Sequence, residues 1–114
     1  MKQNLPYLKH ILDEINFLID KTSGITFEDY LEDEVLTRAT TRSFEIIGEA
    51  VKNLLEDFKN KHNEIEWKKI SGMIDKIIHY YFGVNWNIVW KAIKEKLPEL
   101  KKEFEKFINE LESK

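Results

Sequence analysis

The residues best suited to chemistry lie in one short stretch, GMIDKIIHYYFGVNW, at positions 72–86. His79 is the side chain in this stretch whose charge ordinarily changes near neutral pH, and it follows Asp75 by four residues. Residues four apart share one face of a helix, so the carboxylate could orient the imidazole for proton transfer. The same spacing is common for a hydrogen-bonded histidine at the edge of a core. The residue types alone leave both interpretations of His79 open.

The other candidate ligands give no pattern typical of a metal or cofactor site. The chain has no cysteine, which excludes disulfides, thiolate zinc sites and thiol nucleophiles. His10 and His62 lie among polar residues with no supporting spacing, so we expect both at the surface. Trp67, Trp86 and Trp90 lack interleaved basic residues, so we interpret them as core or dimer-interface anchors rather than platforms for bases. We predict no metal and no cofactor.

Composition indicates a soluble globular protein. The 114 residues are 42% hydrophobic and 34% charged, which is too apolar for a disordered chain and too charged for a membrane protein. Charged residues interrupt the apolar run at the N-terminus, so we expect no signal peptide, no membrane contact and a cytoplasmic location. The net charge of −3 provides no general attraction for nucleic acid. Any contact with RNA must therefore be local.

The elements that must position these residues are predicted to be helices. Apolar residues recur at three and four positions, and glycine and proline are scarce, which predicts an all-α protein. Asn4 and Pro6 are expected to open the first helix, which stops before Gly24. Thr26 and Asp29 predict a capping box for a short second helix, whose continuation Asp33 can cap.

The rest of the chain predicts the remaining helices of a bundle. They are expected over residues 34–58, about 66–82, 86–97, and from Pro98 onwards. Gly48 should bend the helix at 34–58 or allow close packing there. Gly83 should end the helix at about 66–82, and Asn85 should cap the helix at 86–97. The expected fold is an up-and-down bundle of four main helices plus a short extra helix, forming a single domain over residues 1–114.

Four blocks of sequence, in order along nearly the whole chain, carry a family resemblance. They are RSFEIIGEAVKNL (42–54), EWKKISGM (66–73), IIHYYFGVNWNIVW (77–90) and LPELKKEFE (97–105). Together they resemble the HepT-like toxins of the HEPN superfamily, which are encoded beside minimal nucleotidyltransferase antitoxins of the MNT family. The resemblance implies a helical bundle that forms a homodimer, and a metal-independent endoribonuclease whose site faces its symmetry mate across a cleft.

The resemblance also assigns roles to individual positions. Its motif is arginine, a polar residue, three further residues, then histidine, any residue and tyrosine. On this chain the polar residue is Asp75, the histidine is His79 and the tyrosine is Tyr81, whereas Ile74 occupies the arginine position. Isoleucine cannot bind the negative charge that builds on the phosphorane oxygens during RNA cleavage, as a guanidinium can. The motif is therefore degenerate, and we expect impaired activity.

Arg42 and Lys76 could in principle replace the missing guanidinium. Arg42 lies on the long helix, and Lys76 lies two positions after Ile74, so that it points about 200° away from Ile74 around the helix. Neither is therefore a good substitute at that position. An Ile74→Arg change is expected to raise cleavage if the new side chain reaches the cleft, and to destabilise the fold if position 74 is buried.

In HepT pairs the nucleotidyltransferase is thought to transfer AMP to the tyrosine of the motif, which here is Tyr81, with Tyr80 as an alternative acceptor. The leading hypothesis is a HepT-like toxin subunit with an impaired ribonuclease site and RNA as its substrate. The alternative is a non-catalytic HEPN dimer that binds a nucleotidyltransferase, nucleotides or RNA. Only an activity assay separates the two.

Overall fold

The computed structural model describes residues 2–79 and 83–113 of the chain. Within these residues the regular backbone is entirely helical, which confirms the all-α prediction. The elements are a 3-10 turn at Lys2–Asn4, α1 at Leu5–Thr22, α2 at Phe27–Glu32, α3 at Glu34–Asn53, α4 at Glu56–Lys61, α5 at Trp67–His79, α6 at Trp86–Lys91, a π turn at Ala92–Lys96, and α7 at Leu97–Glu112.

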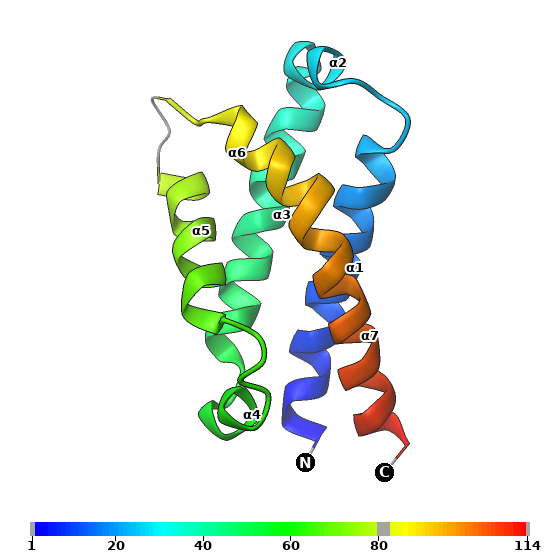
Figure 1. The fold of residues 1–114 in the computed structure, drawn as a ribbon, viewed down its shortest axis with the longest axis vertical. Coiled ribbons are helices and arrows are strands. Elements are labelled where there is room, and N and C mark those ends of the chain that lie inside the picture. Colours follow the sequence, from blue (N-terminus) through cyan, green and yellow to red (C-terminus); the bar gives the residue numbers. More distant parts are fainter. Residues whose placement is uncertain (1, 80–82, 114) are drawn as a thin grey trace.

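The four longest helices form an up-and-down bundle, as predicted. Helices α1 and α5 run in one direction along the long axis, and α3 and α7 run in the other (Figure 1). α1 packs against both α3 and α7, and α3 also packs against α5. The short helices α2 and α4 lie at opposite ends of the bundle, and both termini lie at the end that carries α4 (Figure 1).

Three predicted helix caps are present, at α2, α3 and α6. Thr26 and Asp29 form a reciprocal capping box, with hydrogen bonds of 3.0 and 3.2 Å between side chain and backbone. The Asp33 carboxylate accepts a 3.0 Å hydrogen bond from a backbone N–H in the first turn of α3. Asn85 caps α6 in the same way at 3.1 Å. Each of these caps depends on residues at most three positions apart.

The long helix predicted over residues 34–58 is interrupted. α3 ends at Asn53, the backbone is extended at Leu54 and Leu55, and α4 follows as a separate short helix. The N–H of Leu55 donates a 2.9 Å hydrogen bond to the side-chain oxygen of Asn4, which is buried. Asn4 therefore satisfies a backbone group 51 positions along the chain instead of capping α1 with its side chain.

The two helices expected on either side of Pro98 are joined into one bent rod. α6, the π turn and α7 follow one another without a gap from Trp86 to Glu112. The Leu97 N–H donates to the carbonyl of Ala92, five positions earlier, directly before Pro98. Proline has no N–H and its ring crowds the preceding turn, so the wider π turn lets the helix continue. The Lys94 ammonium donates a 2.7 Å hydrogen bond to the carbonyl of Thr22, which fastens this rod to the end of α1.

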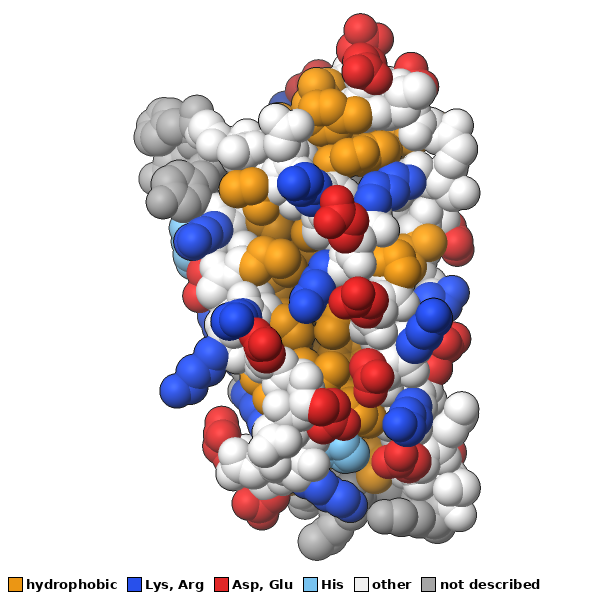
Figure 2. Space-filling model, in the orientation of Figure 1, with side chains coloured by type: hydrophobic (Ala, Val, Ile, Leu, Met, Phe, Trp, Pro, Cys, Tyr) orange, Lys and Arg blue, Asp and Glu red, His pale blue; other side chains and the backbone are white. Residues whose placement is uncertain are grey.

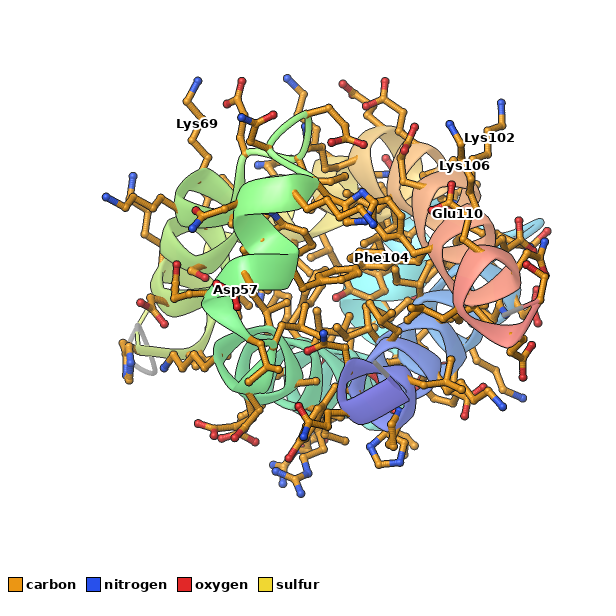
Figure 3. All side chains as sticks on the ribbon, turned by 90° about the horizontal axis from the view of Figure 1, so that it is seen from below. Asp57, Lys69, Lys102, Phe104, Lys106 and Glu110 are labelled. Carbon is orange, nitrogen blue, oxygen red and sulfur yellow. The ribbon has the colours of Figure 1, made fainter. Side chains whose placement is uncertain are left out.

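One core runs through the bundle. Phe104 points from α7 into the interior, whereas Lys102 and Lys106 of the same helix point outwards (Figure 3). The largest fully buried side chains are Tyr30, Phe44, Phe104, Phe107, Leu8, Ile11, Ile15, Leu18, Ile74, Ile93, Leu97 and Val51. No helix in the described part of the chain is both long enough and apolar enough to cross a membrane.

A shallow groove separates α5 from the rod of α6 and α7. Met73 and Ala92 line its middle part, and Ile70 and Leu100 line the part nearer α4. Figure 2 shows apolar side chains gathered along this face between rows of lysine and acidic residues. α5 is thus held mainly by its contact with α3, and its other sides stay accessible.

Candidate functional site

Helix α5 carries the predicted site and is fixed by its inner face. Ile70, Ile74 and Ile77 are spaced four and three positions apart and are all buried. This spacing gives α5 one apolar stripe, which packs against α3. His79 is the last residue of α5, and its side chain is exposed. The packed stripe therefore sets the direction in which His79 projects.

Position 74, where the motif has arginine, faces the core. Ile74 is 1% exposed, and its Cγ2 atom lies only 2.9 Å from the place that a Cβ on Gly48 of α3 would take. The predicted close packing at Gly48 is therefore confirmed. A helix turns about 100° per residue, so Ile74 lies about 140° around α5 from His79. An arginine at position 74 would leave α5 towards α3 rather than on the side of His79.

Asp75 and Lys76 lie on the same side of α5 as His79, about 40° and 60° from it on either flank. The Asp75 carboxylate is half-buried, and its Oδ1 lies 4.0 Å from the Nζ of Lys52 on α3. Asp75 and His79 are both described, and no hydrogen bond joins them. The orientation of His79 by Asp75 therefore stays a prediction.

A hollow of about 310 Å³ lies beside this end of α5. Its walls are Lys76, Ile77, Gly83, Asn85 and Ile88, so α5 forms one side and the start of α6 forms the other. Ile88 is 44% exposed, so the wall formed by α6 presents apolar surface to this hollow. The sequence alone assigns Ile88 no role. Its neighbour Val89 is fully buried and lies about 100° away around α6, so the two apolar side chains cannot both face the core.

The structure does not describe the motif tyrosine, and it shows Arg42 engaged elsewhere. Tyr81, the predicted acceptor of AMP, and its alternative Tyr80 lie outside the described residues. Arg42 is exposed on α3 and forms an ion pair with Glu45 at 2.9 Å.

Of the two other histidines, only His10 is at the surface as predicted. His62 is a correction, because its side chain is 13% exposed. Its ring packs between those of Phe58 and Phe107, with centroids 4.6 and 4.4 Å away. The neighbours of His62 in the sequence are polar and so predict a surface position. The direction of α4, which the sequence does not show, turns the imidazole towards α7.

The three tryptophans pack against the core, which confirms the core part of their interpretation. The rings of Trp86 and Trp90 lie 5.9 and 5.1 Å from that of Tyr30. The Tyr30 O–H donates to the Thr40 hydroxyl at 2.7 Å, because that hydroxyl donates its own proton to a carbonyl of α3. Burial of the phenol raises the pKa of Tyr30 to about 12. This cluster fixes the start of α6, and hence one wall of the hollow.

Comparison with known proteins gives consistent results. A family model described as "Ribonuclease HepT-like" matches residues 11–107. The chain is 55% identical over 108 residues to "Putative RNase TTE0752" of Caldanaerobacter subterraneus subsp. tengcongensis, a match that covers 95% of this chain and 96% of the relative. It is 47% identical over 100 residues to "Probable ribonuclease HepT" of Thermococcus cleftensis, covering 88% and 91% of the two chains. It is 43% identical over 106 residues to "Putative RNase MJ0127" of Methanocaldococcus jannaschii, covering 93% and 88%. No solved structure matches the chain.

Proposed function

The chain belongs to the HepT-like family of ribonucleases, and from this premise we propose that it is an endoribonuclease in which His79 moves protons. The observation that carries the proposal is the position of His79. It is exposed at the end of α5, with Asp75 and Lys76 on the same side of the helix. A proton-transfer group, a carboxylate and a cation are thus available together to one ligand.

The reaction we propose is internal cleavage of RNA. The 2′-hydroxyl attacks the adjacent phosphorus, a base removes the proton of that hydroxyl, and the 5′-oxygen of the next nucleotide leaves with a proton from an acid. The products end in a 2′,3′-cyclic phosphate and a 5′-hydroxyl. In a homodimer each protomer contributes one His79, so the pair can provide both the base and the acid.

The proposed activity is impaired because position 74 lacks a guanidinium. Removing one group that stabilises charge in a transition state typically costs on the order of 100- to 1000-fold in rate. Ile74 contributes no charge and lies in the core. We propose a slow ribonuclease rather than an efficient one.

The family resemblance also supports a toxin role with an MNT-type nucleotidyltransferase as partner. In this proposal the partner transfers the adenylyl group of ATP to the phenol oxygen of Tyr81 and releases pyrophosphate. The added nucleotide places a bulky anion beside His79 and blocks the site. Mass spectrometry of the protein after incubation with ATP and the partner tests this, and a label on any residue other than Tyr81 contradicts it.

The second candidate is a non-catalytic dimer that binds a nucleotidyltransferase, nucleotides or RNA. One observation favours it specifically, which is the burial of Ile74 against Gly48. An apolar residue that packs this closely serves the bundle and cannot serve phosphate chemistry.

A cleavage assay separates the two candidates. The purified protein is incubated with single-stranded RNA in the presence of EDTA, and the ends of the products are identified. We expect slow cleavage to cyclic phosphate ends and a loss of about 100-fold or more in His79→Ala. His10→Ala is the matched control, because His10 is also exposed but lies on α1. Cleavage that is equal in the parent and in His79→Ala would leave only the binding module.

A further inference from the structure

The hollow between α5 and α6 combines an apolar slot with polar groups at its edge. Ile77 is buried and forms its floor, and Ile88 is exposed on the opposite wall. The side-chain oxygen of Asn85 is used in capping α6, so its amide nitrogen remains to donate to a ligand. At about 310 Å³ the hollow is at the small end of the range for ligand sites, which suits one flat ring system.

Lys76 provides this hollow with a positive charge. Within residues 2–79 and 83–113 no ion pair engages Lys76, whereas Lys52 and Lys69 are both paired with carboxylates. Lys76 also precedes His79 by one helical turn, a rise of about 4.5 Å on the same side of α5. The ammonium is therefore within reach of a phosphate that contacts His79, although it points away from Ile74.

We propose that this hollow binds one nucleotide of RNA next to the bond that is cleaved. Ile77 and Ile88 contact the faces of the base, Asn85 donates a hydrogen bond to its edge, and Lys76 pairs with its phosphate. The inference rests on the proposed ribonuclease function and adds the substrate subsite. It also gives Lys76 the role of a cation beside the reacting phosphate, reached from the side of His79 instead of from position 74.

The two halves of the subsite predict different effects on RNA binding. Binding of a labelled single-stranded RNA to the His79→Ala protein is measured at several salt concentrations, so that cleavage does not interfere. Lys76→Ala should weaken binding by about tenfold at low salt and lower the slope of log affinity against log salt by about 0.7, equally for all base compositions. Ile88→Ala should weaken binding by about three- to tenfold, change the preference among the four homopolymers, and leave the salt slope unchanged.

Matched controls are available elsewhere on the surface. Lys106→Ala removes an exposed lysine of α7, and Leu31→Ala removes an apolar side chain of α2 that is 45% exposed, close to the 44% of Ile88. Both controls should bind RNA like the parent. Circular dichroism of every variant verifies that the helices are intact.

A second measurement separates failure of the subsite from failure of the ribonuclease function. Methyl NMR spectra of the protein are recorded with 5′-AMP, with adenosine and with inorganic phosphate. The Ile77 and Ile88 signals should shift with 5′-AMP and shift less with adenosine. In Lys76→Ala the shifts with 5′-AMP should fall to those seen with adenosine. If the parent cleaves RNA but Lys76→Ala and Ile88→Ala match their controls, the subsite is overturned and the ribonuclease stands. If RNA is neither bound nor cleaved, the ribonuclease is overturned, and unchanged isoleucine signals with 5′-AMP would overturn the subsite too.

Discussion

At the scale of single residues, the direction of a side chain matters more here than its place in a motif. Lys76 and Ile74 are two positions apart in sequence, yet one lies beside His79 and the other is buried against α3. The sequence places both on one helix and puts Ile74 in its apolar stripe, but it does not show which helix that stripe packs against. The burial of Ile74 depends on Gly48, which is 26 positions away and creates the space that Ile74 fills.

An Ile74→Arg variant tests this orientation. Because position 74 is 1% exposed, the guanidinium would be buried without a partner, and we expect the free energy of unfolding to fall by about 3 kcal/mol or more. Urea unfolding measures the change, provided that the denaturant slope stays constant. Lys76→Arg, exposed on the same helix, should change stability by less than about 0.5 kcal/mol. An Ile74→Arg protein that is as stable as the parent and cleaves RNA faster would show that the arginine reaches the cleft.

At the scale of helices, local signals are readable from the sequence and distant ones are not. The caps formed by Thr26, Asp33 and Asn85 involve neighbouring residues, and all three were predicted. The sequence does not predict the end of α3 at Asn53, because this end depends on a hydrogen bond from Leu55 to Asn4 across the bundle. The sequence likewise suggested a break at Pro98, where a π turn lets the helix continue. The candidate histidine could be located by motif, whereas the hollow beside it required the packing of α5 and α6.

The contact between α3 and α5 can be measured with a double-mutant cycle. Gly48→Ala places a Cβ 2.9 Å from Ile74 Cγ2, so it should destabilise the protein by about 1–2 kcal/mol despite the better helix propensity of alanine. In an Ile74→Ala background that methyl is gone, and Gly48→Ala should then be neutral or stabilising by up to about 1 kcal/mol.

The matched control for this cycle is Gly72→Ala on α5. A Cβ at Gly72 has nothing within 4 Å, so this change should stabilise the helix by about 0.5–1 kcal/mol in either background. If Gly48→Ala stabilises the parent as Gly72→Ala does, the two helices do not approach as closely as 2.9 Å implies.

At the scale of the whole molecule, the bundle is small and leaves its candidate site at one edge. The protein measures 45 × 27 × 20 Å. His79 is the last residue of α5, which runs away from the end that carries the termini and stops short of α2 (Figure 1). One exposed histidine provides either a base or an acid at a given moment, whereas the proposed reaction uses both. A homodimer that brings two copies of His79 to one cleft would meet this need.

The homodimer can be tested by mixing subunits. Parent and His79→Ala proteins are unfolded together in equal amounts and refolded, so that protomers combine at random. If each cleft needs His79 from both protomers, only parent dimers are active and cleavage falls to about one quarter, whereas independent sites would retain about one half. Mixing the parent with Lys106→Ala in the same way should leave cleavage unchanged, because Lys106 is an exposed residue of α7 that points away from the core (Figure 3). Light scattering of each mixture reports the mass of the species that is assayed. A monomer at micromolar concentration, or cleavage that falls only to one half, would contradict a shared site and would require a single His79 to act first as base and then as acid.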